Sequence, residues 1–150
     1  LRLVRPLLVV AFVAETYGPD FIDINFGCPV KKVVKRNGGS GCLRDLDLVE
    51  AIIRSVNDAT SLTTTVKIRS GFSEKTRDPV GIGLRCEQAG AQAICLHPRT
   101  RSDMYSGQAR WSEIAALVVN EATKRNKLAI REALTVVSEV SELFLQFRFL

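Results

Sequence analysis

Three short apolar segments, each followed directly by polar residues, constrain the fold of this chain more than any other feature. They cover residues 21–25, 63–68 and 93–97, and the second is rich in β-branched side chains. Segments with helical patterns separate them along the chain. Strands that alternate with helices predict an α/β fold with a parallel sheet and right-handed crossovers, in either a (β/α) barrel or a doubly wound open sheet. In both folds the functional site lies at the carboxyl ends of the strands.

Capping and breaking residues set the ends of the predicted helices. Asp45 or Asp47 can cap the helix after the first strand, and Asp78-Pro79 is a favourable start for the helix after the second. Two further helices are predicted, one over residues 6–17 and one from about 111 to 119, after the third strand. The first strand is mostly apolar, so we expect it to be buried on both faces.

The composition is that of one soluble globular domain. The chain has 150 residues, of which 46% are apolar and 25% charged. The formal charge of +5 is compatible with a polyanionic partner, but the basic residues are spread along the chain and many basic proteins bind no nucleic acid. The apolar run at residues 7–14 is too short to cross a bilayer, so we predict no membrane association.

The cysteines and the single histidine do not have the spacing of a metal site. The four cysteines form no C-x-x-C pair, and His97 lies at no ligand spacing from them, so we expect no bound metal. Cys86 and Cys95 lie in apolar stretches that are typical of buried thiols. Reduced thiols of this kind indicate a cytoplasmic protein.

Cys28 is the first candidate for a functional side chain. It lies between Gly27 and Pro29, where the first strand ends in a turn, and its sulfur is expected to be accessible there. A thiol in this place can be a nucleophile, a proton donor or a residue without a chemical role. Because no histidine or acidic partner is near it in sequence, proton donation by the neutral thiol is at least as good an interpretation as nucleophilic attack.

The polar residues after the second and third strands form a second candidate cluster. Lys67 and Arg69 are two residues apart and therefore point to one face of a strand, and His97 and Arg99 repeat that spacing. Two cations on the inner face of a barrel are costly unless an anion or a cofactor meets them; the alternative is a solvated strand end. The glycine-rich stretch 37–41 matches no phosphate-binding or dinucleotide-binding motif, and we expect it to permit loop motion.

Four motifs in this order resemble the tRNA-dihydrouridine synthase family, in particular its bacterial branch. They are Asp23-Ile24-Asn25-Phe26-Gly27-Cys28-Pro29-Val30-Lys31-Lys32, Gly39-Ser40-Gly41, Val66-Lys67-Ile68-Arg69-Ser70-Gly71 and His97-Pro98-Arg99-Thr100-Arg101. The resemblance covers roughly residues 10–119. It implies a partial (β/α)8 TIM barrel of about three βα units, so we predict a barrel segment over residues 1–119 and a divergent, helical tail over residues 120–150.

The resemblance also implies an activity. The family's enzymes are FMN-dependent oxidoreductases that reduce particular uridines of tRNA to 5,6-dihydrouridine, with NADPH as the reductant. Carried over to this sequence, Cys28 is expected to be the catalytic general acid that protonates carbon 5 of uracil. Lys67 and His97 are expected to contact FMN. The residues expected to contact the substrate are Asn25, Arg69 and Arg99.

Two alternatives remain open for the function. One is a truncated, non-catalytic remnant that binds neither FMN nor tRNA, because an open three-stranded parallel sheet leaves strand edges unpaired. The other is a different FMN-dependent TIM-barrel oxidoreductase, such as a dihydroorotate dehydrogenase. The pattern of Lys67, Arg69, His97 and Arg99 together with Cys28-Pro29 argues against this second alternative.

Overall fold

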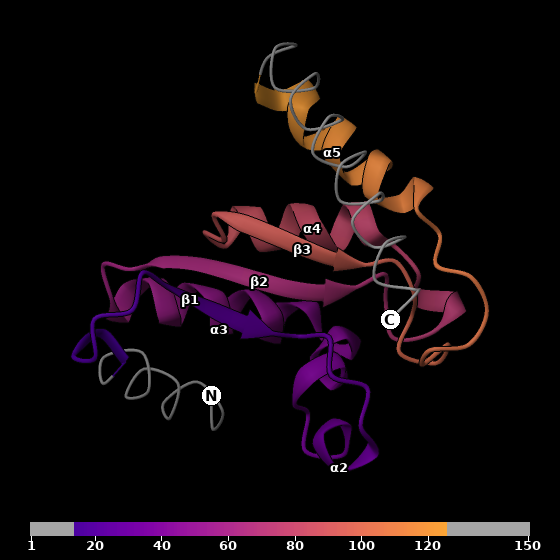
Figure 1. Cartoon of the computed structure of the whole chain (residues 1–150), viewed down its shortest axis with the longest axis horizontal. Coiled ribbons are helices and arrows are strands. Elements are labelled where there is room, and N and C mark those ends of the chain that lie inside the picture. Colours follow the sequence, from indigo (N-terminus) through magenta and orange to yellow (C-terminus); the bar gives the residue numbers. More distant parts are fainter. Residues whose placement is uncertain (1–13, 126–150) are drawn as a thin grey trace, which may run out of the picture. The chain divides into compact units, whose positions relative to one another are not determined.

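The computed structural model describes residues 14–125, with side chains described as far as residue 119. Three strands alternate with helices along this part of the chain (Figure 1). The elements are, in order, β1 (Phe21–Asn25), α2 (Lys31–Val34), the 3-10 helix η1 (Gly39–Arg44), α3 (Leu46–Ala59), β2 (Thr63–Arg69), the 3-10 helix η2 (Glu74–Thr76), α4 (Pro79–Gln88), β3 (Ala93–His97) and α5 (Ser112–Arg125). The chain divides into two compact units between Ala109 and Arg110; the sheet belongs to the first unit and α5 to the second.

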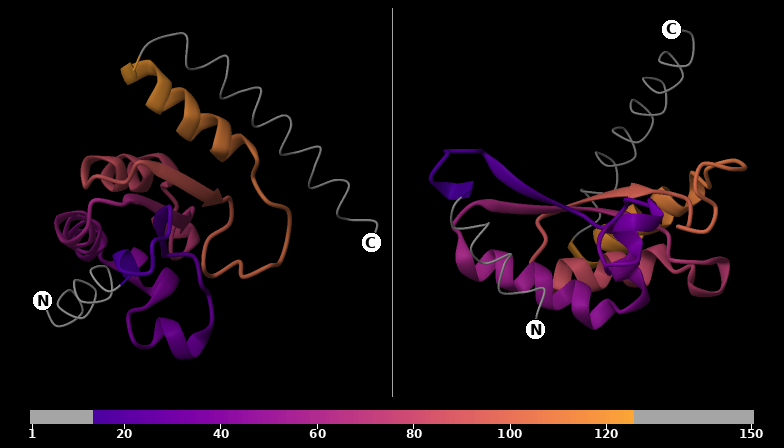
Figure 2. Two further views of the ribbon diagram at one scale, coloured as in Figure 1. Left: turned by 60° about the vertical axis from the view of Figure 1, so that its left-hand side comes forward. Right: turned by 90° about the horizontal axis from the view of Figure 1, so that it is seen from below.

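The three strands form one parallel sheet in the order β1-β2-β3. Asn25 of β1 is in register with Lys67 of β2, which is in register with Cys95 of β3. Helices α3 and α4 contact each other and pack on the same face of the sheet (Figure 2). In a (β/α) barrel, consecutive strands of the chain are neighbours in the sheet, and the helices that connect them all lie on one side of it. The three strands follow this arrangement. The predicted partial barrel is therefore confirmed; the described residues form an open sheet and no closed barrel.

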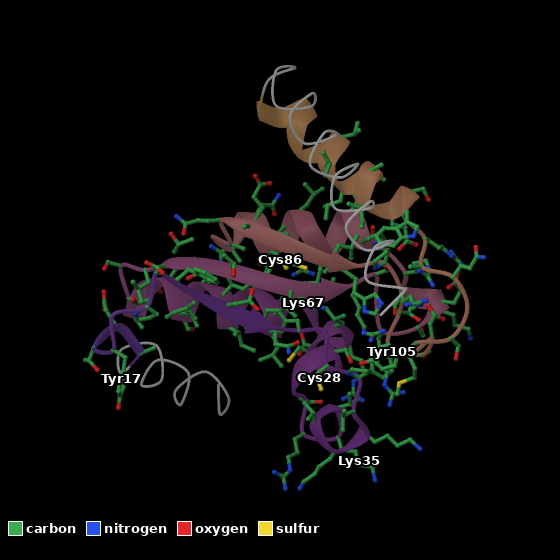
Figure 3. All side chains as sticks on the ribbon, in the orientation of Figure 1. Tyr17, Cys28, Lys35, Lys67, Cys86 and Tyr105 are labelled. Atoms are coloured by element: carbon green, nitrogen blue, oxygen red, sulfur yellow. The ribbon has the colours of Figure 1, made fainter. Side chains whose placement is uncertain are left out.

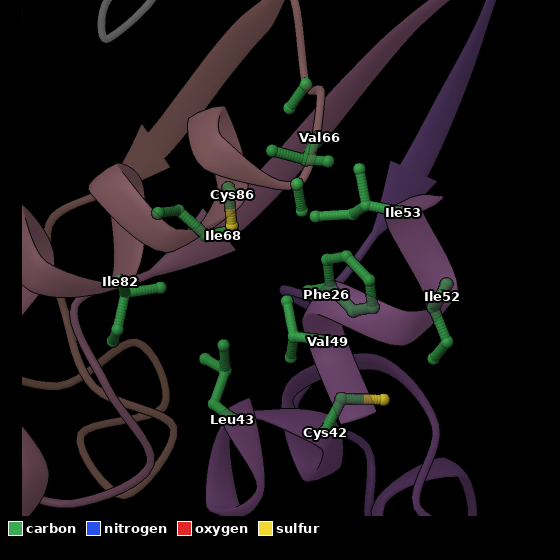
Figure 4. Packing of buried hydrophobic residues seen from close by; sticks show 12 residues of the cluster. Phe26, Cys42, Leu43, Val49, Ile52, Ile53, Val66, Ile68, Ile82 and Cys86 are labelled. Carbon is green, nitrogen blue, oxygen red and sulfur yellow. The ribbon is translucent and has the colours of Figure 1, made fainter. Parts of the chain in front are cut away.

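The hydrophobic core lies between this sheet and the two helices (Figure 4). Val66 and Ile68 of β2 are fully buried in it, because alternate residues of a strand face the same side. The rest of it comes from α3, α4, η1 and the loops after β1 and α4: Phe26, Cys42, Leu43, Val49, Ile52, Ile53, Ile82, Cys86, Ala89 and Ala91. The apolar residues of α3 recur at helical spacing, so one side of this helix packs on the sheet.

Aspartate caps start both helices that cover the sheet. Asp45 accepts a hydrogen bond from the backbone N–H of Leu48 at 3.1 Å, and Asp78 accepts one from that of Gly81 at 2.9 Å. Pro79 occupies the first position of α4. A backbone N–H at this position has no hydrogen-bond partner within the helix, so proline, which lacks one, loses no hydrogen bond there. Of the two predicted caps of α3, Asp45 is the one that the structure uses, and the predicted start of α4 at Asp78-Pro79 is confirmed.

The opposite face of the sheet is not covered by the described residues, and this corrects two predictions. Phe21 of β1 is 55% exposed, so the prediction that the first strand is buried on both faces is wrong. Cys95 of β3 is also exposed, although Cys86 of α4 is buried as predicted. Both differences have one cause: α3 and α4 cover only the side to which β2 directs Val66 and Ile68.

Other elements differ from the predictions mainly in extent. The stretch between β1 and α3, for which no helix was predicted, contains α2 and η1. The helix predicted from 111 to 119 is α5, which continues to Arg125. Most of the helix predicted over residues 6–17 lies outside the described residues, of which Ala14 and Glu15 are helical. Residues 126–150 of the predicted tail also lie outside them.

Candidate active site

Cys28 lies in a turn that the side chain of Asn25 closes at the end of β1. The Asn25 Oδ1 atom accepts hydrogen bonds from the backbone N–H groups of Gly27, at 2.9 Å, and Cys28, at 3.1 Å. The Phe26 N–H donates to the carbonyl oxygen of Lys67 at 2.8 Å, so the chain stays paired with β2 until the turn begins. Cys28 is half-buried, and Figure 3 shows it near the end of the sheet that also carries Lys67. The turn therefore presents a free thiol at the carboxyl edge of the sheet.

The glycine-rich segment 38–41 packs directly against this turn. The backbone N–H and the hydroxyl of Ser40 both donate to the carbonyl oxygen of Cys28, at 3.0 and 2.8 Å. Gly39 has a φ of +52°, and a Cβ atom built on it would lie 2.7 Å from the Cβ of Cys28. We expected these glycines to permit loop motion; the structure gives them a packing role, because only a residue without a side chain fits against Cys28.

Replacing Gly39 by alanine is expected to destabilise the fold more than replacing Gly18, which serves as a matched control. Gly18 also has a positive φ, of +66°, but no atom lies within 4 Å of a Cβ built there. Gly18→Ala should therefore lower the free energy of unfolding by about 1 to 2 kcal/mol, the cost of the left-handed conformation alone. Gly39→Ala should lower it by about 1 to 3 kcal/mol more, because its methyl group overpacks the Cys28 turn. Urea unfolding measures both values, and equal losses would contradict the packing role.

Arg69 is buried at the end of β2 and links the loops that follow β1 and β3. It is 1% exposed. Its Nε atom donates to the carbonyl oxygen of Gly27 at 2.8 Å, and its Nη1 atom donates to those of Thr100, at 2.9 Å, and Met104, at 2.7 Å. Its guanidinium also lies 5.4 Å from the ring centroid of Tyr105, and burial lowers its pKa. One side chain therefore fixes the peptide before Cys28 relative to the loop after β3.

His97 and Arg99 form a second contact at the same edge of the sheet. A guanidinium nitrogen of Arg99, Nη1, lies 3.2 Å from Nε2 of His97. Burial, followed by the positive charges of Arg69, Lys67 and Arg99, lowers the pKa of His97 to about 4. The imidazole is therefore neutral at neutral pH, and the guanidinium donates to Nε2, which leaves the ring proton on Nδ1.

Lys67, Arg69 and Arg99 surround this neutral histidine with positive charge. A methyl group on Gly27 would lie 3.9 Å from Nζ of Lys67, which places the ammonium group beside the Cys28 turn. Lys67 forms no ion pair with any described residue, and the buried Nε of Arg99 has no hydrogen-bond acceptor among them. Unpaired cationic groups away from water are costly. We conclude that the cluster suits an anionic or electron-rich ligand.

Several residues of this site carry no signal that the sequence alone reveals. Ser40 holds the Cys28 carbonyl from twelve positions away, and Met104 contributes only a backbone oxygen to Arg69. The exposed ring of Tyr105 lies near both Arg69 and His97, and its centroid is 6.3 Å from that of the His97 ring. Within residues 14–125, no group of three or more His, Cys, Asp or Glu side chains is placed to hold a metal ion. No helix in the same range is long and apolar enough to cross a membrane.

The fold and the site define a segment of a (β/α) barrel with a thiol and a cationic cluster at the carboxyl ends of its strands. The sequence model of the dihydrouridine synthase family matches residues 4–123. The chain therefore belongs to the dihydrouridine synthase family, as its four motifs predict.

Curated relatives carry the same family name. The chain is 45% identical over 100 residues to tRNA-dihydrouridine synthase B of Pseudomonas aeruginosa. The aligned residues make up 67% of this chain and 30% of the relative. It is 42% identical to the protein of that name from Pseudomonas putida over the same shares of both chains. It is 43% identical over 102 residues to the probable tRNA-dihydrouridine synthase 1 of Synechocystis, and these residues make up 68% of this chain and 29% of the relative. The chain thus spans about 30% of the length of these relatives.

Proposed function

We propose that this chain is part of a tRNA-dihydrouridine synthase, an oxidoreductase that reduces particular uridines of tRNA to 5,6-dihydrouridine. One observation carries the proposal: the free thiol of Cys28 and the cationic cluster of Lys67, Arg69 and Arg99 lie at the same edge of one sheet. The names of the relatives support it, since they describe synthases of dihydrouridine in tRNA.

The cationic cluster fits FMN, which we propose as the cofactor, with NADPH as the reductant. When bound and reduced, FMN supplies a hydride to carbon 6 of uracil. Lys67 and His97 would hold it, because an electron-rich group is attracted to the positive charges that lower the pKa of His97. The unpartnered Nε of Arg99 is a buried donor that such a group can also satisfy.

Cys28 is the proposed general acid. Addition of hydride to carbon 6 leaves enolate-like negative charge on uracil, so a proton donor close to carbon 5 lowers the barrier. A thiol can give this proton without becoming covalently attached to the base. The turn that Asn25 and Ser40 hold would fix the direction from which the proton arrives.

The substrate contacts are proposed for exposed or partly exposed side chains. Asn25 is exposed, and no described residue bonds to its amide nitrogen, which would bind the target base; Arg99 would lie near it. The target uracil must leave its stack to reach Cys28. The predicted contact of Arg69 with the substrate stays a prediction, and its burial favours a role in holding the loops around the site.

Uptake of FMN by the 150-residue chain tests the cofactor site. We expect added FMN to bind stoichiometrically, with visible flavin bands that remain after gel filtration. Lys67→Met should weaken this binding about 10-fold or more, because a charged hydrogen-bond donor contributes on the order of 1.5 to 3 kcal/mol. Lys75→Met is the matched control, since Lys75 is an exposed lysine of η2 outside the cluster.

The same experiment separates this proposal from a non-catalytic remnant. A colourless chain that also fails to take up added FMN would exclude an enzyme made of this chain alone. Equal weakening by Lys67→Met and Lys75→Met would show that the cluster does not hold the flavin. FMN binding without dihydrouridine formation from NADPH and tRNA would instead favour another FMN-dependent oxidoreductase.

A further inference from the structure

The stretch that follows Cys28 concentrates positive charge. Residues 24–44 contain five basic residues and no acidic one, whereas the formal charge of the whole chain is +5. The residues are Lys31, Lys32, Lys35, Arg36 and Arg44. The cations are therefore not evenly spread over the molecule, and this local excess lies next to the candidate general acid.

Four of these cations form one exposed face, here called the α2 basic face: Lys31, Lys32, Lys35 and Arg36. They lie on α2 and on the turn that continues it, with two pairs spaced four residues apart, and Val34 on the other side of the helix is buried. Figure 3 shows Lys35 projecting away from the body of the structure at this helix. The face is thus presented to solvent.

None of the four cations of this face forms an ion pair with a described residue. Three other basic residues, in contrast, do form ion pairs. Arg54 pairs with Glu50, Arg77 with Asp103 at 2.7 Å, and Arg85 also with Glu50. The α2 basic face therefore offers charges that no carboxylate of the described part of the chain neutralises.

Packing ties this face to the site. Arg44, the fifth cation, is used internally: its Nη2 atom donates to the carbonyl oxygen of Val34 at 3.1 Å and to Oδ1 of Asn37 at 2.7 Å, and it lies 5.0 Å from the ring centroid of Phe72. Ser40, which lies in η1 with Arg44, donates its hydroxyl hydrogen bond to the carbonyl oxygen of Cys28 at 2.8 Å. The C-terminal end of α2 and the segment that follows it are therefore held against the Cys28 turn.

We propose that the α2 basic face binds the phosphate backbone of single-stranded RNA next to the uridine that reaches Cys28. This inference rests on the proposed function, which makes tRNA the substrate. A base that leaves its stack lies in a locally unpaired strand, whose phosphates are the nearest negative charges to the site. Lysines contact phosphates as point charges, so this face would position the strand without reading its sequence.

Direct binding of a tRNA transcript by the full chain tests the proposal without FMN or NADPH. Removing two phosphate contacts by Lys32→Gln with Lys35→Gln should raise the Kd about 25-fold at 0.1 M salt, and lower the slope of log K against log salt by about 1.4. The matched control is Arg54→Gln with Lys75→Gln, which removes the same charge from exposed positions elsewhere. We expect less than about a twofold change for this control. Fluorescence anisotropy measures both, and unchanged circular dichroism shows that the variants are folded.

Four outcomes would overturn the inference. They are equal loss of binding in both double variants, an unchanged salt slope, no tRNA binding by the unaltered chain, or binding to vesicles of anionic phospholipid that the Lys32 and Lys35 changes weaken as much as RNA binding. If Lys32→Gln with Lys35→Gln fails to fold, Lys31→Gln with Arg36→Gln repeats the test on the same face. Selective RNA binding with no dihydrouridine formed would contradict the proposed function and leave the inference standing.

Discussion

Replacing Cys28 by alanine is expected to lower dihydrouridine formation about 100-fold to 10,000-fold, the usual contribution of a positioned general acid. The FMN-loaded variant should still consume NADPH, because the flavin contacts proposed for Lys67 and His97 do not involve the thiol. Counting dihydrouridine in tRNA by mass spectrometry, beside the rate of flavin bleaching by NADPH, separates the two half-reactions.

Cys95→Ala is the matched control for this result. Cys95 is also a free cysteine; it is exposed and lies on the open face of the same sheet. We expect it to change dihydrouridine formation by less than about twofold, since it is assigned no chemical role. Undiminished product in the Cys28→Ala variant would refute proton donation by this thiol. Loss of flavin reduction as well would show that the change had damaged the cofactor site.

Arg69→Met is expected to cause the largest loss of stability of the changes considered. The substitution leaves three backbone oxygens, of Gly27, Thr100 and Met104, without their donor in a buried place. Each buried acceptor left unpaired costs about 1 to 3 kcal/mol, so the free energy of unfolding should fall by at least about 3 kcal/mol. Arg54→Met, which removes only an exposed ion pair at 3.8 Å, should cost less than about 1 kcal/mol. Urea unfolding measures both.

A second readout distinguishes loop positioning by Arg69 from a general contribution to stability. Arg69→Lys keeps the charge but cannot donate to both loops at once, so we expect a smaller loss of stability than in Arg69→Met. The rate at which Cys28 reacts with an alkylating agent, measured in a Cys95→Ala background, should nevertheless change several-fold, because the Gly27 carbonyl is no longer held. An unchanged rate together with unchanged stability would contradict the linking role.

The sequence predicted the strands and helix caps well because these depend on local patterns. Two such patterns are the β-branched run at Thr63–Ile68 and the aspartates before α3 and α4, which act within one strand or one turn. The structure confirms the strand and the caps that they predict. The exposure of Phe21 was not predictable in this way. An apolar strand has the same sequence whether one face or both are covered, and only the packing of α3 and α4 on a single side decides it.

The candidate site was predictable by residue type but not by arrangement. The two-residue spacing placed Lys67 and Arg69 on one face of β2, yet the loops after β1 and β3 bury only Arg69. Its acceptors are backbone carbonyl groups, which every residue possesses and no sequence pattern marks. The fit of Gly39 against Cys28 depends on a contact between segments eleven residues apart. Motif resemblance located these residues, while the three-dimensional contacts explain why each is needed.

The open face of the sheet has a practical consequence. In a (β/α) barrel the helices lie outside, so the face opposite α3 and α4 lines the interior, and Asn25, Lys67 and Cys95 share it as register partners. Cys95 is therefore a native labelling position on the exposed face that would line the interior of a barrel. In a Cys28→Ala background, a thiol-reactive dye on Cys95 would sense any further strand or protein segment that comes to cover this surface.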